Sequence, residues 1–348
     1  MKKGIERALR LLFGALVAGV VVLCGAFAYY AMTGIETAPL PLQFSLRTGS
    51  GLRSAALQME RAGVLKHPER FVVMARLLGE AGNIKAGNYE LEAPITPYRL
   101  LAKITQGEVT LVSVTFPEGW TFRQMRKVLD DHPAVKHETQ GLGDADILQR
   151  LGAKEASPEG LFFPDTYHFG NGSSDLLILR RAYRLMQAQL AEQWAGRAPG
   201  LPLETPYEAL ILASIVEKET GRAVDRPLVA AVFVNRLRKK MLLQADPTVI
   251  YGIGEGFDGN LRKRDLTTDT PYNTYTRTGL PPTPIAMPGL AAITATLNPP
   301  QSDVLYFVSR GDGTSVFSRT LGEHERAVTK YQRSGRRRAD QPNNNPGR

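Results

Sequence analysis

The stretch "ASIVEKET", residues 213–220, closes the apolar run "EALILASIV" with a Glu-Lys-Glu sequence. Thr205 and Glu208 ahead of this run form the pattern of an N-terminal capping box, and Pro206 occupies the first helical position. Gly221 then serves as a stop signal. We therefore expect a buried helix that ends in two carboxylates.

The two glutamates of this run point to roughly opposite sides of the expected helix, because a helix turns about 100° per residue. Glu219 shares the more strongly apolar side with Leu212, Ile215 and Val216, whereas Glu217 does not. A carboxyl held against such a wall is desolvated and its pKa rises, as a general acid requires near neutral pH. The same run is also typical of a solvated helix end, so both interpretations stay open here.

Composition limits the classes of partner and cofactor. The chain has 348 residues, enough for two or more domains, and a net charge of +9 that suits an acidic partner. The single cysteine, Cys24, cannot form an internal disulfide, and the five histidines show no metal-binding spacing. We predict no metal and no cofactor. Nucleic-acid binding would rest on charge alone, and the export argued next speaks against it.

Residues 11–32 contain no charged side chain and are long enough to span a bilayer as one helix. The basic residues of the 1–10 segment predict that this end stays cytoplasmic and that the rest of the chain is exported. The "AFA" sequence at 26–28 also fits the cleavage site of a signal peptide. The apolar run is long for a signal peptide, which favours an anchor.

A linker over 33–41 leads into a strand–turn–helix pattern that occurs twice, at 44–65 and 114–135. Between the copies, "AGNYELE" predicts a strand and "TPYRLLAKITQG" a helix capped by Thr96. Residues 42–110 are thus expected to form a small α+β module of the strand–helix–helix–strand kind.

The rest of the chain is predicted to be a mainly helical, mixed α+β domain over 111–332, followed by a disordered basic tail at 333–348. A long loop over 253–288 is rich in Gly, Pro, Asn and Tyr, and a loop of that length is typical of a functional segment. A hairpin around "GDGT" and a helix from Thr320 close the domain. The other expected helices cover 174–196, 225–241, 246–252 and 289–297.

Four motifs in order carry a resemblance to a known family. They are "GLFFPDTYHF" (160–169), "ASIVEKET" (213–220), "VAAVFVNRLRKKMLLQADPTVIYG" (229–252) and "YNTYTRTGLPPTPIAMPG" (272–289). They resemble the YceG-like family of endolytic murein transglycosylases over nearly the whole chain. The resemblance implies a membrane anchor, a LysM-like module over 42–110 and a catalytic domain.

The resemblance also implies the site. The catalytic glutamate of the family is the second of the Glu-Lys-Glu run, which maps to Glu219 and agrees with the helix-face argument. Asp246 also fits a helix cap and Asn235 a helix–loop contact, whereas tyrosine rings and amides suit sugars. The candidate substrate-binding residues are Ser214, Glu217, Asn235, Gln244, Asp246, Thr248, Tyr251, Asn273 and Tyr275.

The reaction implied is cleavage of the bond between N-acetylmuramic acid and N-acetylglucosamine within peptidoglycan strands, leaving 1,6-anhydromuramyl ends and terminating glycan growth. The implied partners are glycan strands and peptidoglycan synthases, at the inner membrane with the N-terminus cytoplasmic. Two alternatives remain. One is a wall-binding scaffold in which Glu219 is structural, and the other is a muramidase that uses water and Asp246 as a second carboxylate.

Overall fold

The computed structural model describes residues 2–219 and 222–333, with side chains over 10–219 and 222–332. The predicted helix stop at Gly221 and residues 334–348 of the predicted basic tail lie outside this range. The chain is a mixed α+β protein that divides into two compact units. The first comprises Met1–Ser113 and His168–Ser173, and the second comprises Val114–Tyr167 and Ser174–Arg348.

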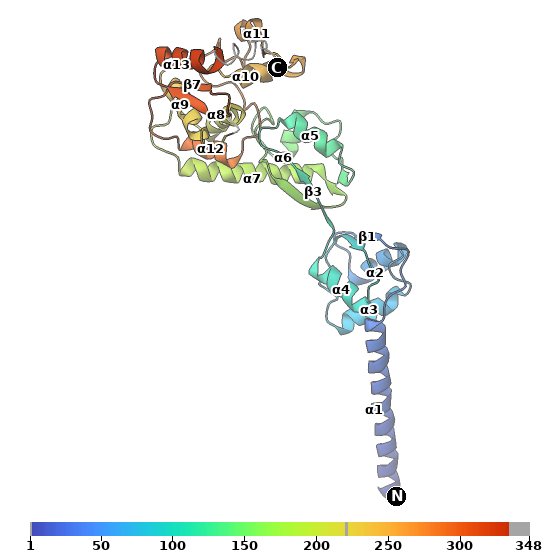
Figure 1. Ribbon diagram of the computed structural model, residues 1–348. Helices are drawn as coiled ribbons and strands as arrows, with labels where there is room; N and C mark the ends of the chain where they lie inside the picture. Colours follow the sequence, from blue (N-terminus) through green and yellow to red (C-terminus); the bar gives the residue numbers. More distant parts are fainter. Residues whose placement is uncertain (1, 220–221, 334–348) are drawn as a thin grey trace, which may run out of the picture. The chain divides into compact units, whose positions relative to one another are not determined.

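The first unit begins with a long apolar helix and continues as a small α+β module (Figure 1, blue to teal). The segment Arg10–Met32 of the first helix has a mean hydropathy of 2.6 and is long and apolar enough to cross a membrane. The elements are α1 (Lys2–Met32), β1 (Leu42–Leu46), α2 (Leu52–Arg61), α3 (Pro68–Leu77), β2 (Gly87–Leu91) and α4 (Pro97–Gln106).

The module folds around an antiparallel pair, β1 with β2, as the strand–helix–helix–strand prediction requires. Phe44 stands opposite Tyr89 in the register, and their rings stack with centroids 5.3 Å apart. Alternate residues of both strands are buried, because side chains point to opposite faces of a strand. The buried face packs on α2, α3 and α4 to form the core of the unit.

The two predicted strand–turn–helix copies are both confirmed. The first is β1, Gly49 and α2. The second is β3 (Leu111–Thr115), Gly119 and α5 (Phe122–Asp130). Both glycines are left-handed, with φ of 79° and 75°, a conformation that other residues adopt at a cost.

The second unit is mainly helical, and β3, β5 and β6 each contain residues of both units. Strands β3 and β5 pair, as do β4 with β6 and β7 with β8. The remaining elements are β4 (Val135–Lys136), α6 (Asp144–Leu151), β5 (Thr166–Gly170), β6 (Ser173–Ser174), α7 (Asp175–Ala195), α8 (Pro206–Glu219), α9 (Arg226–Arg238), α10 (Asp246–Ile253), the 3₁₀ turn η1 (Gly254–Gly256), α11 (Lys263–Thr267), α12 (Leu290–Leu297), β7 (Tyr306–Ser309), β8 (Ser315–Ser318), α13 (Leu321–Val328) and the π-helical turn η2 (Thr329–Arg333).

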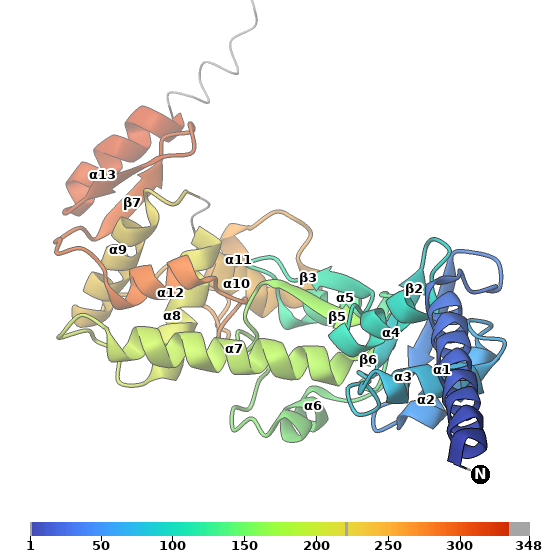
Figure 2. The same cartoon turned by 90° about the horizontal axis from the view of Figure 1, so that it is seen from below.

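Helix α8 lies at the centre of this unit. It packs against α12, α9, α7 and α10 (Figures 1 and 2). Every residue from Ala209 to Val216 is buried, which is the pattern of a helix that is apolar on all sides. Residues 217–219, the charged run, are therefore the part of the described helix that emerges from the core.

The local start and stop signals of most helices are where the sequence predicts them, with one correction. Thr96 caps α4 by accepting a hydrogen bond from the Arg99 N–H at 3.2 Å. Asp246, however, is the first residue of α10 and makes no capping bond, because Ala245 occupies the N-cap position. The carboxylate of Asp246 is thereby left for other contacts. The predicted irregular segment 253–288 also contains the short helix α11.

Candidate active site

Helix α8 brings the Glu-Lys-Glu run to the rim of the second unit. The helix starts where the capping pattern predicts, since Thr205 Oγ1 accepts a hydrogen bond from the Glu208 N–H at 3.2 Å. The Glu208 carboxylate accepts one from the Glu204 N–H at 2.6 Å. These contacts set where the helix begins, and its described part runs to Glu219.

The Glu219 side chain is partly buried, and burial raises the pKa of its carboxyl to about 7. The negative charge of Asp246 adds to this increase, and the positive charge of Arg236 opposes it. Within the described residues, the carboxyl has no hydrogen bond or ion pair that would hold it ionised. A carboxyl in this state keeps its proton near neutral pH and can donate it.

Asp246 and Tyr275 stand next to Glu219 as a bonded pair. The Tyr275 hydroxyl donates a hydrogen bond to Asp246 Oδ1, which belongs to the first turn of α10. Burial raises the pKa of Tyr275, and the charges of Asp246 and Glu219 raise it further. Tyr275 therefore remains a neutral hydrogen-bonding group at any ordinary pH.

Arg236 supplies the positive charge of the site, although no sequence pattern indicated it. Its Nε donates to the carbonyl oxygen of Leu305 and its Nη1 to that of Leu243, both at 2.8 Å. The guanidinium also lies over the Tyr306 ring, 5.2 Å from the centroid. Its position directly after Asn235 in the "VFVNRL" motif was the available clue.

Gln244 joins this group through Arg236. Its Oε1 accepts a hydrogen bond from Arg236 Nη1 at 3.4 Å, and its backbone N–H donates to the Thr274 carbonyl at 3.0 Å. Its φ is 52°, in the left-handed region that non-glycine residues seldom adopt. The surrounding contacts hold it there, and strain of this kind tends to gather at functional sites.

Glu217 has a different environment from Glu219, as the helix-face argument requires. Its Oε2 accepts a hydrogen bond at 3.0 Å from the N–H of Gly289, the N-cap of α12. Burial raises its pKa, and the nearby charge of Glu118 raises it further, while the Gly289 bond lowers it. Glu217 thus joins α8 to the start of α12.

Four of the candidate binding residues serve the scaffold. Asn273 is 1% exposed, and its Nδ2 donates to two backbone carbonyls of α11 and to that of Thr268 just after it. Asn235 binds two backbone carbonyls, at Ser302 and Val304. Ser214 and Thr248 are fully buried and bonded to backbone or Thr274. These side chains therefore hold the backbone that surrounds the site.

Tyr251 is hydrogen-bonded to a second buried acid, Glu159, which no sequence pattern indicated. Its hydroxyl donates to Glu159 Oε2 at 3.2 Å, while the Phe122 N–H donates to Glu159 Oε1 at 3.0 Å. Glu159 is 5% exposed, and burial raises its pKa to about 7. The available clue was that Glu159 directly precedes the apolar motif "GLFFPDTYHF", since a buried acid is rarely found without a partner.

The environment of Glu159 borders a cavity of about 970 Å³ between α5 and α10. Tyr251 and Tyr272 form one wall, with ring centroids 4.9 Å apart in an edge-to-face arrangement. Tyr251 lies five residues after Asp246 on α10, which is roughly 7.5 Å along the helix axis at 1.5 Å per residue. Helix α10 therefore contributes Asp246 to the Glu219 site and Tyr251 to this cavity, about one turn and a half further along.

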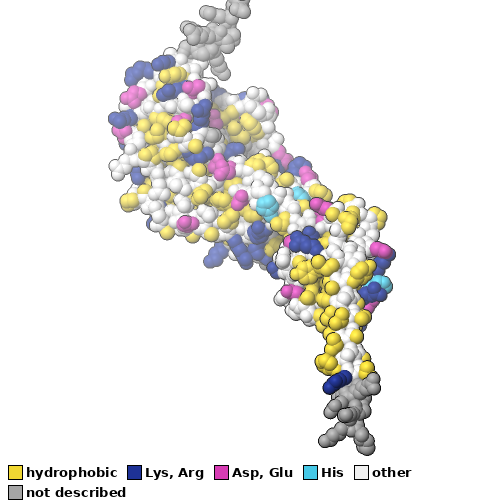
Figure 3. All heavy atoms as spheres, turned by 60° about the horizontal axis from the view of Figure 1, so that its bottom comes forward, with side chains coloured by type: hydrophobic (Ala, Val, Ile, Leu, Met, Phe, Trp, Pro, Cys, Tyr) yellow, Lys and Arg dark blue, Asp and Glu magenta, His cyan; other side chains and the backbone are white. Residues whose placement is uncertain are grey.

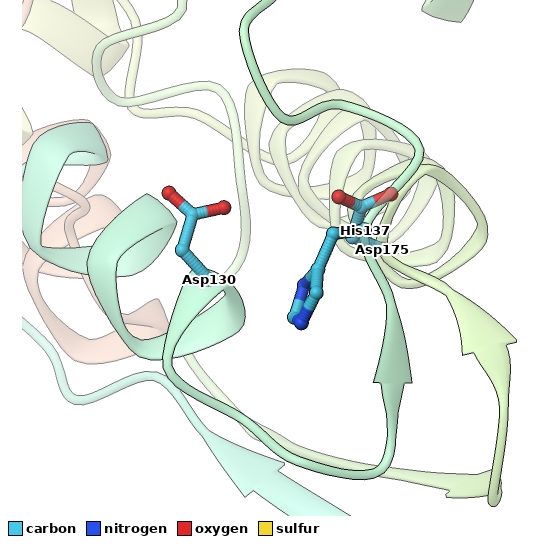
Figure 4. Close-up of side chains that lie close together, drawn as sticks. All are labelled: Asp130, His137 and Asp175. Carbon is cyan, nitrogen blue, oxygen red and sulfur yellow. The ribbon is translucent and has the colours of Figure 1, made fainter.

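One group has the side chains of a cation site, at the junction of α5, β4 and α7. Asp130, His137 and Asp175 each offer an atom within 4.8 Å of the others (Figure 4). The buried Asp175 carboxylate already accepts hydrogen bonds from Glu138 N–H, from Thr139 N–H and Oγ1, and from Leu176 N–H. These donors occupy its lone pairs, so its chemistry is that of a structural junction rather than a metal ligand.

The chain is similar in sequence to named proteins of other bacteria. It is 31% identical over 309 residues to an endolytic murein transglycosylase of Bacillus subtilis (strain 168), covering 83% of this chain and 84% of that protein. It is 29% identical to the protein of the same name from Streptococcus pneumoniae serotype 2 (strain D39 / NCTC 7466), covering 81% of this chain and 57% of that one.

A crystal structure of a YceG-like protein from Listeria monocytogenes has a similar fold, with a TM-score of 0.50 and 29% identity. The match covers 82% of this chain and 98% of that one. The family model described as the YceG-like family matches residues 44–330, which include both copies of the strand–turn–helix pattern and the whole Glu219 site. The chain belongs to the YceG-like family.

Proposed function

We propose that this protein is an endolytic murein transglycosylase that cleaves glycan strands of peptidoglycan, with Glu219 as its acid. The observation that supports this most directly is the desolvated Glu219 carboxyl, whose pKa of about 7 keeps a proton available near neutral pH. The relatives named endolytic murein transglycosylases supply the substrate class.

The chemistry needs one carboxyl in two roles. Protonated Glu219 donates its proton to the glycosidic oxygen between N-acetylmuramic acid and N-acetylglucosamine, and the bond from that oxygen to C1 breaks. The Glu219 carboxylate then takes the proton of the muramyl 6-hydroxyl as that oxygen bonds to C1. The product has a 1,6-anhydromuramyl end, Glu219 recovers its proton, and no water is consumed.

The neighbours of Glu219 have supporting roles in this proposal. Asp246 raises the pKa of Glu219 by its charge, and Arg236 limits the rise. The phenol of Tyr275, bonded to Asp246, and the exposed amide of Gln244, bonded to Arg236, are polar groups of this site that suit sugar hydroxyls. Ser214, Asn235, Thr248 and Asn273 hold the surrounding backbone.

The placement of the enzyme is part of the proposal. We infer that α1 anchors the chain in the inner membrane with its N-terminus cytoplasmic, since the basic residues precede the apolar segment. The β1–α2–α3–β2 module would be the LysM-like glycan-binding part, and peptidoglycan synthases the partners. An anchored enzyme of this kind acts on new strands beside the membrane and terminates their growth.

The test compares the full chain in detergent with its Glu219→Gln variant on isolated murein sacculi. We expect the variant to lose about 10²–10⁴-fold in rate, the usual contribution of a general acid. Glu217→Gln is the matched control, because glutamine can still accept the Gly289 hydrogen bond, and its rate should stay within about tenfold of wild type. Mass spectrometry of the soluble products should show anhydromuramyl ends from the wild type.

The position of Asp246 supports a second candidate, a muramidase that uses water, since its charge acts on Glu219. Such an enzyme would release reducing muramyl ends instead of anhydro ends. If Glu219→Gln and wild type released equal amounts of product, Glu219 would not be the acid. If neither released product while both bound sacculi, the scaffold function would replace the enzyme.

A further inference from the structure

The end of helix α1 packs directly against the α+β module of the first unit. Phe27, Tyr30 and Ala31, in its last two turns, pack against the core of the α+β module. The following residues are also tied down, since the Ile35 N–H donates to the Ile95 carbonyl at 2.8 Å. The module is therefore held against the end of the apolar helix.

A pocket of about 680 Å³ lies at this junction. Its inner wall is apolar and comes from the last turns of α1 and from one side of α3, including Phe27, Val73 and Met74. Its ionisable lining residues are Glu36, Lys66, His67, Glu69 and Arg70. An apolar interior with a charged rim suits an amphipathic ligand.

One cation of the rim, Arg70, has no side-chain partner among the described residues. Lys66 forms an ion pair with Glu36, and His67 Nδ1 lies 3.4 Å from Glu69 Oε1. The Arg70 guanidinium, in contrast, has no hydrogen bond or ion pair with any described residue. A guanidinium with unused N–H groups can bind two oxygens of a phosphate in a bidentate manner.

Hydrophobic side chains continue from α1 onto the surface of the module (Figure 3). On α3, Val73 is 56% exposed and Leu77 is 70% exposed, and a spacing of four residues puts them on one face. Tyr29 on α1 and Tyr98 on α4 are also exposed. Contiguous exposed apolar groups next to a membrane helix, with tyrosines among them, are typical of a membrane interface.

We propose that this pocket binds an anionic phospholipid of the leaflet from which α1 emerges. Its phosphate would lie on Arg70 and an acyl chain would run along α1 beneath Val73 and Leu77. The inference rests on the anchoring part of the proposed function, since only an inserted α1 brings the pocket to the headgroup level. Such a lipid would seat the module on the membrane surface.

The test uses the full chain in nanodiscs of equal parts phosphatidylcholine and phosphatidylglycerol. A photoreactive benzoylphenylalanine substituted for Val73 should cross-link to phospholipid, with phosphatidylglycerol enriched over its share of the disc. The same residue substituted for Leu57, which is 42% exposed on α2 and lines a different depression, is the matched control and should not capture lipid. Mass spectrometry identifies the lipid in each adduct.

A second variant tests the phosphate contact. Arg70→Ala should lower the phosphatidylglycerol-to-phosphatidylcholine ratio of the Val73 adducts about fivefold, the effect of one basic residue near an anionic membrane. Arg61→Ala, on α2, should leave it unchanged.

Three results would overturn the site: no lipid adduct at Val73, equal capture at Leu57, or an unchanged lipid ratio in Arg70→Ala. A chain that does not co-elute with the discs would contradict the anchor and the site together. Release of murein products in the sacculus assay is a separate readout that does not depend on the lipid.

Discussion

At the residue scale, the site depends on the different surroundings of two glutamates that are two positions apart. Glu217 is tied to the start of α12 by the Gly289 N–H, whereas Glu219 faces Asp246 and Arg236 from a partly buried position. A hydrogen bond from a backbone N–H favours the charged form of a carboxyl, and desolvation favours the neutral form. Burial raises the pKa of both carboxyls, but the rise for Glu217 is opposed by the Gly289 bond, which suits a structural acid, whereas Glu219 suits a proton donor.

The charge of Asp246 should be visible in the pH dependence of the reaction. Glu219 acts in its protonated form, so the rate should fall as pH rises through its pKa of about 7. Asp246→Asn removes a negative charge that raises this pKa, so the descending limb of the pH–rate profile should move to lower pH. Asparagine can still accept the hydrogen bond from Tyr275, which keeps the local structure.

Asp303→Asn is the control for this measurement, since Asp303 is an exposed partner of Arg319 and belongs to another part of the unit. Its profile should match that of the wild type when kcat/KM on soluble glycan strands is followed across the pH range. A limb that stays in place in Asp246→Asn, or moves to higher pH, would show that the charge of Asp246 does not act on the catalytic acid.

The sequence predicts the environment of the residues on α8 better than it predicts which residues from other segments contact the site. The position of Glu219 follows from a helical pattern, which is local, and so does the burial behind it. Arg236 and the pair formed by Glu159 and Tyr251 depend on contacts between segments distant along the chain, which a pattern within one segment does not contain. Asn273 has a residue type that suits sugars, yet its amide is used by the loop that it holds together.

At the element scale, helix starts and turns were predictable where a side chain or a glycine decides them locally, as at Thr96 and at Gly119. The start of α10 was not, because Asp246 is the favoured residue type for an N-cap, yet Ala245 occupies that position and the Asp246 carboxylate accepts from Tyr275 instead. The helix α11 inside the expected irregular segment has only five residues, too short for a periodic pattern.

Glu159 joins two elements, and its burial should make the stability of the second unit depend on pH. Its pKa is about 7 in the folded chain against an ordinary value of 4.5, so the folded state holds the proton more tightly than the unfolded state. The contribution of this group to stability is therefore full below pH 4.5 and is lost as pH rises to about 7, a change of roughly 3 kcal/mol.

Glu159→Gln should lack this loss, since its amide does not ionise and can still accept from the Phe122 N–H. We expect the difference in unfolding free energy between acidic and alkaline pH to be smaller in the variant by about 3 kcal/mol. Urea unfolding can be followed by the fluorescence of Trp120 and Trp194, which both belong to the second unit. Equal pH dependence in the two proteins would mean that Glu159 is not desolvated.

The approach of Gly160 to the loop before α12 makes a matched pair of glycine substitutions possible. Gly160 has φ of 79°, and an added Cβ would lie 2.4 Å from Pro284 Cβ, a rigid ring atom. Gly141 has φ of 78° and open space around the same position. Gly141→Ala should cost only the left-handed strain of about 1–2 kcal/mol.

Gly160→Ala should cost this strain and a further overpacking penalty of about 1–3 kcal/mol. The same tryptophan-monitored unfolding measures both variants. Equal losses in the two would show that the loop around Pro284 yields freely, and the loop would then not be a fixed wall of the site.

At the scale of the whole molecule, the chain is built as two units with separate cores. The first core comes from β1, β2 and the helices α2 to α4, with the end of α1 packed on it. The second surrounds α8 and comes from α7, α9 and α12. A unit with its own buried core unfolds as a cooperative unit of its own. The local patterns predicted many elements of both units but not α6, α11 or the strands β4, β5 and β6. The boundary, which falls within β3 and β5, depends on pairing between distant strands.

This independence gives the last prediction. Met59→Ala in α2 and Ile178→Ala in α7 each remove a fully buried side chain, and each should destabilise its own unit by about 2–5 kcal/mol. Ile178→Ala should lower the urea midpoint of the tryptophan signal. Met59→Ala should leave that midpoint unchanged and instead speed hydrogen exchange in residues 42–106, read by mass spectrometry on the full chain. A shift of the tryptophan midpoint in Met59→Ala as large as that in Ile178→Ala would show that the two cores unfold together. In that case the lipid contact at Arg70 would stabilise the Glu219 site as well as the module, since any ligand that binds the folded chain alone favours everything that folds with its site.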